Sequence, residues 1–325
     1  MKLAILLKTM CAVMALAALP VPSIAQTDWP NKAVKIIVSF PPGGSSDVVA
    51  RQIAQHLSSV FGQQFIVENR SGAGGNIGTD AVAKAAPDGY TLGNSTSGPL
   101  ANNKLLYKSM PFDAQKDLTP VALVGEIPLV IAANPAIKAK NLKEFVALGK
   151  VGGSAFSVGH PGNGTIGHLA MESLKALSGV NLQMVPYKGD APAMTDLLGG
   201  QIELAGAPVT AFIPNIQAGK IRALAVTSRK RFPGLPEVPT AIEQGIDLEA
   251  TVWNAVVGPA GLPKAIVTRL NAEINRYTNS PEGRAKLALF ALVPANTSPE
   301  GLGTLMSNEP AKWKAIVESS KISLE

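Results

Sequence analysis

One pattern of a strand, a glycine-rich turn and a helix occurs twice in this chain. A mainly apolar run at residues 34–40 leads into the turn at 41–46, and residues 155–159 lead into the turn at 160–165. Each turn precedes a helical stripe, so it gathers free backbone N–H groups at the positive end of a helix dipole. We call these turns the first and the second cradle. Two candidate anion cradles in two separate units indicate capture of a ligand rather than catalysis.

Between the cradles, hydrophobic runs of strand length alternate with segments of helical periodicity. In the first unit Val49, Ile53, Leu57 and Val60 form a single apolar stripe, and Gly62 ends the helix. Such alternation is typical of an α/β fold. We therefore expect lobes that each contain a mainly parallel sheet flanked by helices.

The chain is expected to cross between two lobes twice, through residues 121–134 and 251–258. Lobe 1 is then discontinuous, built from residues 26–126 and 250–325, and lobe 2 comprises residues 127–249. Two crossing segments would form a hinge.

The N-terminus reads as a secretory signal peptide. Lys2 and Lys8 accompany an apolar run at residues 10–19, and small residues precede a plausible cleavage site after Ala25. The run is shorter than the roughly 20 residues that a bilayer requires. We therefore predict that residues 1–25 are removed and that the mature chain is soluble outside the cytoplasm.

Composition excludes several classes of function. The single cysteine, Cys11, lies within the signal, so the mature chain has neither a disulfide nor a catalytic thiol. Removal of Lys2 and Lys8 lowers the net charge from +6 to +4. This modest positive charge can favour anionic ligands, but no run of like charges marks a face for nucleic acid.

The second cradle allows three interpretations. Residues 162–167 match the G-x-G-x-x-G pattern of dinucleotide sites, but no acidic residue ends the next strand to hold a ribose. A cradle for a small anion and a merely tight structural turn remain. The first cradle could likewise bind a ligand, or Ser45 or Ser46 could simply cap the helix.

Other polar clusters are less specific. A third glycine cluster at residues 70–78 also precedes a helix, and residues 94–98 could line a cleft or cap a helix. His160 and His168 flank the second cradle without an acidic cluster at metal-ligand spacing, so no metal site is expected. His168 could contact either a ligand or the cradle loop. No nucleophile elbow or zinc-protease motif is present, which argues against an enzyme.

Eight stretches follow one another along the chain in a distinctive order. They are residues 39–47 (SFPPGGSSD), 67–78 (VENRSGAGGNIG), 86–92 (APDGYTL), 162–165 (GNGT), 185–189 (VPYKG), 195–201 (TDLLGGQ), 223–228 (ALAVTS) and 235–240 (LPEVPT). Together they closely resemble the Bug-type substrate-binding receptors of tripartite tricarboxylate transporters.

This resemblance covers essentially the whole mature chain. It implies a monomeric periplasmic receptor of the Venus flytrap kind, without a cofactor, that passes a small organic carboxylate to integral-membrane permease subunits. A periplasmic sensing module that presents its liganded form to a signalling protein is the alternative. With His168 added from the motif analysis, the expected ligand-binding residues are Phe40, Pro42, Gly43, Gly44, Ser45, Ser46, Asn94, Ser95, Thr96, Gly162, Asn163, Gly164, Thr165, His168, Ala207 and Trp253.

The chain departs from the family pattern at two places. Small residues at 204–208 stand where many relatives carry an aromatic ring and an acid, and Gly93 and Asn94 replace a more usual apolar pair. Smaller side chains could enlarge the pocket or reduce repulsion of a second anionic group. The sequence therefore leaves the identity of the carboxylate open.

Overall fold

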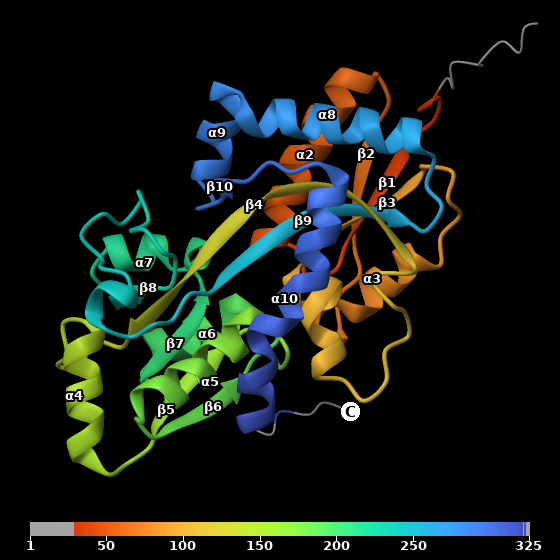
Figure 1. The fold of residues 1–325 in the computed structure, drawn as a ribbon. Coiled ribbons are helices and arrows are strands. Elements are labelled where there is room, and N and C mark those ends of the chain that lie inside the picture. The colour runs from red at the N-terminus through yellow and green to blue at the C-terminus, as the bar shows by residue number, and fades with distance from the viewer. Residues whose placement is uncertain (1–28, 321, 323–325) are drawn as a thin grey trace, which may run out of the picture.

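The structure is a computed structural model that describes residues 29–320 and residue 322. The expected signal peptide, residues 1–25, lies outside the described residues. Figure 1 shows two lobes joined by the long strands β4 (Leu118–Ala133) and β9 (Thr251–Pro259). Within the described residues, no helix combines the length and apolar character needed to cross a membrane.

Lobe 1 is built on strands β1 (Val34–Val38), β2 (Phe65–Asn69) and β3 (Thr91–Thr96). β1 pairs in parallel with both β2 and β3, and β3 pairs antiparallel with β9. Because side chains alternate along a strand, Ile36 and Ile37 of β1 enter different hydrophobic clusters on the two faces of the sheet.

Helices cover both faces of this sheet. α2 (Ser45–Phe61) and α8 (Lys264–Asn279) pack on the Ile36 face, whereas α3 (Asn76–Ala83) and part of α10 (Pro299–Ser319) pack on the Ile37 face. The predicted stripe of α2 is confirmed at Val49, Ile53 and Leu57, which are buried, but not at Val60, which is 44% exposed. Gly62 ends the helix at a φ of 68°. α9 (Pro281–Ala288) and the short β10 (Val293–Pro294) follow α8, and β10 pairs with β4.

Lobe 2 repeats the arrangement. β5 (Phe156–His160) pairs in parallel with β6 (Leu182–Pro186) and β7 (Leu204–Pro208), while β8 (Arg222–Val226) runs antiparallel to β4. The helices of this lobe are α4 (Leu142–Gly152), α5 (Ile166–Ser178), α6 (Asp190–Leu198) and α7 (Ile213–Gln217). α4 and α5 share one hydrophobic cluster, and α6 contributes to the other.

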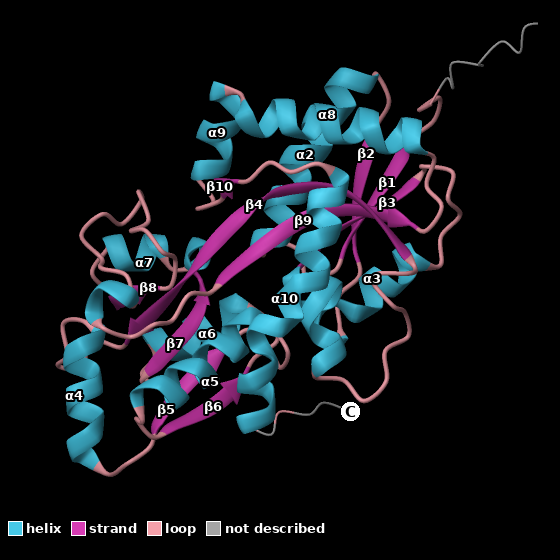
Figure 2. Ribbon diagram, in the orientation of Figure 1, coloured by secondary structure: helices cyan, strands magenta, loops and turns pink. Residues whose placement is uncertain are grey.

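The two sheets meet along β4. β4 pairs with β9 from Leu118 to Pro128 and then with β7 from Leu129 to Ala133. Figure 2 shows the resulting run of strands from β2 through the joining pair to β6. The two-lobe α/β prediction is confirmed, with the addition that β4 and β9 make the centre of the sheet antiparallel. The lobe boundaries at residues 126–127 and 249–250 stay predictions.

Helix α10 forms a third link that the sequence did not predict. Its Leu302 and Met306 pack in the α3-side cluster of lobe 1, whereas Trp313 and Val317 pack with residues of lobe 2. Pro310 lies inside the helix between these two halves. Proline lacks an N–H group, so one helical hydrogen bond is missing where the helix passes between lobes.

Candidate functional site

The first cradle lies between the carboxyl end of β1 and the start of α2. Gly44 is the N-cap of α2 and offers no side chain to accept from the first N–H groups of the helix. Helices α4, α5, α9 and α10 are instead capped by the side chains of Asn141, Thr165, Ser280 and Ser298. The α2 terminus therefore presents N–H donors and a helix dipole toward an outside anion.

Asp47 fixes the shape of this turn. Its carboxylate accepts from the backbone N–H of Gly43 at 3.0 Å, from Arg51 at 2.9 Å and from Asn69 at 2.8 Å. Burial alone would raise the pKa of Asp47, but the hydrogen bonds from Arg51, Gly43 and Asn69 hold it below its ordinary value. The carboxylate is thus ionised and paired, and Gly43 adopts the left-handed φ of 79° that the turn requires.

Ser46, in the first turn of α2, joins two buried asparagines. Its hydroxyl donates to Asn254 Oδ1 at 3.0 Å, and its carbonyl accepts from Asn94 Nδ2 at 3.2 Å. The remaining atoms, Asn94 Oδ1 and Asn254 Nδ2, have no hydrogen-bond partner within residues 29–320, although both residues are at most 1% exposed. A ligand or a water molecule at the open helix terminus would supply the hydrogen bonds that these buried amide atoms lack.

Strand alternation separates the other expected residues of this region. Thr96 pairs in register with Asn254 and shares a face of the sheet with Asn94. Ser95 points to the opposite face, where its hydroxyl bonds to Ser39 and Thr79. Trp253 is also buried on that opposite face, in the cluster of Leu100, Leu302 and Met306. The structure therefore does not bring Ser95 or Trp253 together with Ser46.

The second cradle connects β5 to α5 and is held by its own side chains. Thr165 caps α5 by accepting from the His168 N–H, and its hydroxyl donates to the Gly162 carbonyl at 2.7 Å. Gly162 and Gly164 have φ values of 139° and 79°, a region that favours glycine. The cradle is thus a loop whose shape is fixed by its own hydrogen bonds.

Two stacked histidines complete this loop. His168 Nδ1 accepts from the backbone N–H of Gly164 at 3.3 Å, and His160 Nδ1 lies 3.2 Å from the Gly162 carbonyl. The two rings stack with centroids 4.4 Å apart. Burial, together with its neighbour His168, lowers the pKa of His160 to about 3, and burial lowers the pKa of His168 to about 4. Both rings are therefore neutral at pH 7, and each backbone contact fixes the tautomer of its ring.

The second cradle packs directly against lobe 1. A Cβ atom on Gly74 would lie 3.4 Å from the Asn163 carbonyl oxygen, and one on Gly98 would lie 3.7 Å from that of Gly164. The ring of Phe40 lies in the same region. A Cβ atom built on Gly75, the residue after Gly74, would lie 3.2 Å from the Phe40 ring. In contrast, Pro42 and Gly43 are exposed, and Ala207 is fully buried in β7.

Asp190 is a residue that the sequence reasoning missed. It begins α6 directly after Gly189, whose N–H donates to the Pro161 carbonyl at 2.9 Å, so it lies beside the second cradle. Its side chain is only partly exposed, and burial raises the pKa of its carboxyl to about 7. Asn254 was also missed, although a polar residue within an apolar strand was a visible signal.

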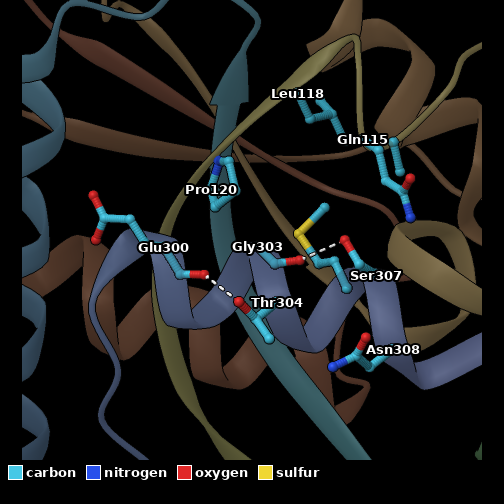
Figure 3. A pocket seen from close by; sticks show the side chains of 10 residues that line it. Gln115, Leu118, Pro120, Glu300, Gly303, Thr304, Ser307 and Asn308 are labelled. Atoms are coloured by element: carbon cyan, nitrogen blue, oxygen red, sulfur yellow. Dashed lines mark hydrogen bonds between the residues drawn. The ribbon is translucent and has the colours of Figure 1, made fainter.

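A cavity of 390 Å³ lies elsewhere, between α10 and residues 114–120 (Figure 3). Its hydroxyl groups already bond within the helix, Thr304 to the Glu300 carbonyl and Ser307 to that of Gly303. None of the expected ligand-binding residues lines it. Its lining includes neither the N-terminal residues of α2 nor the unpaired amides of Asn94 and Asn254, so the cradles remain the stronger candidate. No cluster of metal-ligating side chains occurs in the described part of the chain.

Comparison with known proteins gives consistent matches. Residues 49–322 match the family described as "Tripartite tricarboxylate transporter family receptor". The protein BugT of Bordetella pertussis is 37% identical over 313 residues, which is 96% of each chain. Rpa4515 of R. palustris, solved with adipate, is 35% identical with a TM-score of 0.87 and covers 91% of this chain and 99% of its own. The periplasmic binding protein BugD is 33% identical with a TM-score of 0.84, covering 91% and 100%.

Proposed function

Because this chain belongs to the family of tripartite tricarboxylate transporter receptors, we propose that it captures a small organic carboxylate between its lobes and delivers it to a membrane permease. The family is one of receptors rather than enzymes. A relative of the same fold was solved with adipate, and another is named a periplasmic binding protein. We place this receptor in the periplasm, reached through the predicted signal peptide, and expect it to act as a monomer.

The open N-terminus of α2 is the observation that carries this proposal. It lies at the carboxyl ends of β1 and β3, where ligands of α/β sheets bind, and no side chain of its N-cap Gly44 occupies its donors. The unpaired amide atoms of Asn94 and Asn254 adjoin it through Ser46. A carboxylate at this position would accept from the helix and from Asn254.

Magnitudes support a site shared by two lobes. A carboxylate gains about 1.5–3 kcal/mol from each charge-assisted hydrogen bond and roughly 0.3–1 kcal/mol from a helix terminus. Association costs on the order of 4–15 kcal/mol, whereas micromolar binding requires about −8 kcal/mol. One cradle is therefore insufficient, and we propose that residues of the second cradle, Gly162 to Thr165 with His168, close over the ligand.

A thermal-shift screen over small carboxylates, followed by calorimetry, tests ligand capture. A ligand that binds only the folded state must raise the melting temperature. Ser45→Asp places a carboxylate on the α2 terminus and should abolish binding while the protein stays folded. Ser59→Asp, on an exposed position near the other end of α2, is the matched control and should bind normally. Unchanged affinity in folded Ser45→Asp would refute the site.

Delivery needs its own measurement. Vesicles containing the cognate permease should accumulate labelled ligand only when the receptor is supplied, and the Ser45→Asp receptor should not support uptake. Uptake that proceeds equally without receptor would refute the transport role while leaving ligand capture intact.

A further inference from the structure

Two segments of lobe 1 are buried in a hydrophobic cluster of lobe 2. Most members of this cluster, among them Leu169 of α5, come from lobe 2. Three members come from lobe 1 instead: Leu106 is 2% exposed, Trp313 of α10 is 3% exposed and Val317 of α10 is 7% exposed. Side chains of lobe 1 therefore depend on lobe 2 for part of their burial.

The second half of α10 brings the larger share of this contact. Figure 1 shows it beside α5, and the two helices lie close together. Helix α10 also lies close to the short turn Asn103–Leu105 of lobe 1, which Leu106 directly follows. Pro310 separates this half from Leu302 and Met306, which pack within lobe 1. The second half of α10 is thus packed between parts of different lobes.

The contact makes no polar demand on lobe 2. The indole Nε1–H of Trp313 donates to Glu309 Oε1 at 3.0 Å, one turn earlier in the same helix. The side chains of Leu106 and Val317 carry no donor or acceptor. Hydrophobic contacts are non-directional, so these surfaces can separate and rejoin without leaving a buried polar group unpaired. Separation costs only the exposure of apolar area to water.

Movement of the lobes must break this packing. Lobe 2 joins lobe 1 through β4 and β9, and its second cradle touches the region of Gly74 and Gly98. A rotation that withdraws the cradle also moves α5 relative to Leu106. If the second half of α10 stays with Leu106, it leaves α5, and if it follows α5, it leaves Leu106. Either way, one apolar contact is lost when the lobes separate.

We propose that Leu106, Trp313 and Val317 form an apolar latch that stabilises the closed arrangement of the two lobes. Burial of these side chains favours closure whatever lies between the cradles, so a ligand adds to a bias that the chain already has. A latched receptor opens less often and releases its ligand more slowly. The inference concerns movement of the lobes and stands whichever ligand the receptor binds.

Spin labels on the two lobes test the latch in refolded receptor without added ligand. The only cysteine, Cys11, lies in the predicted signal, so labels can be attached specifically to Ser59→Cys on α2 and Lys150→Cys on α4. Both positions are exposed, one in each lobe. Pulsed electron resonance should give one main distance for the labelled receptor. Adding Leu106→Ala leaves a gap in the latch and should move at least about a third of the molecules to other distances.

Two further variants show whether the effect belongs to the latch. Leu302→Ala makes the same change in the half of α10 that packs within lobe 1, and it should leave the main distance unchanged. Val317→Ala removes less volume and should shift the distances as Leu106→Ala does, so it decides the question if Leu106→Ala fails to fold. Distances that stay unchanged in both latch variants would overturn the inference. An equal shift in folded Leu302→Ala would also overturn it.

Discussion

The Nδ1 atom of His168, in the first turn of α5, accepts a hydrogen bond from the backbone N–H of Gly164, in the loop before that helix. Both groups are buried, and the neighbouring ring of His160 stacks on that of His168. The second cradle therefore keeps its shape without a ligand. This preorganisation reduces the entropy that binding must overcome.

Replacing His168 by leucine should destabilise the protein. The Gly164 N–H would be left buried without an acceptor, at a cost of about 1–3 kcal/mol in the free energy of unfolding. His56→Leu is a suitable control, because His56 also stacks on a ring, that of Tyr277, but its Nε2, 3.8 Å from Glu273 Oε2, forms no hydrogen bond within the described residues. Urea denaturation of both variants measures the difference. A smaller loss for His168→Leu than for His56→Leu would contradict this account.

Stability should fall as the pH drops below about 6.5. The pKa of His160 is lowered to about 3 and that of His168 to about 4, so the unfolded chain binds these protons at a higher pH than the folded protein. The loss reaches about 1.4 kcal/mol per pH unit for each histidine between pH 6.5 and 4. Asp190 acts in the opposite direction, because burial raises its pKa to about 7 and the cost of burying its charge is relieved as the folded protein takes up a proton below that pH.

Comparing the unfolding free energy at pH 7 and pH 5 separates these effects. The double variant His160→Gln/His168→Gln should lose clearly less stability on acidification than the native chain. The only other histidine is His56, which both proteins retain. An identical pH dependence would show that the pair does not titrate as described.

The sequence predicted the features that local periodicity controls. The stripe of Val49, Ile53 and Leu57 and the repeated strand, turn and helix each place apolar residues on one face, so they could be read without knowing their neighbours. Strand alternation could also have separated Ser95 from Asn94 and Thr96, since successive side chains point to opposite faces.

Features that depend on distant partners could not be read in this way. From the sequence, His168 could contact either a ligand or the loop that contains Gly164. Only the folded structure shows that its Nδ1 contacts the loop. Helix α10 contains Gly301 and Gly303 in its first half and Pro310 near its middle, and these residues disfavour a helix locally. Packing of Leu302 and Met306 against lobe 1 stabilises it instead.

Gly78 lets α3 approach β1 closely. A Cβ atom there would lie 2.5 Å from the Arg70 carbonyl oxygen and 2.8 Å from the Ser39 Cα. Gly78→Ala should therefore destabilise the fold by about 1–3 kcal/mol despite the better helix propensity of alanine. Gly303→Ala in α10 has its nearest neighbour at 3.6 Å and should be neutral or stabilising. Thermal unfolding of the two variants gives the comparison, and a stabilised Gly78→Ala would disprove the close approach.

The Thr210 hydroxyl donates to the Phe290 carbonyl at 2.6 Å, joining the turn after β7 in lobe 2 to the segment after α9 in lobe 1. We expect this bond to form only where the lobes are in contact, because separated lobes would expose both groups to water. Thr210→Val removes the donor and keeps the shape, so it should weaken the closed form by about 0.5–1.5 kcal/mol.

Ligand affinity should therefore fall about twofold to tenfold in Thr210→Val, mainly through faster dissociation. Stopped-flow and calorimetric measurements with the carboxylate that gives the largest thermal shift would determine both quantities. Thr304→Val is the matched control, because the Thr304 hydroxyl is exposed and bonds only within α10. Equal dissociation rates in the two variants would show that the bond between Thr210 and Phe290 does not hold the lobes together.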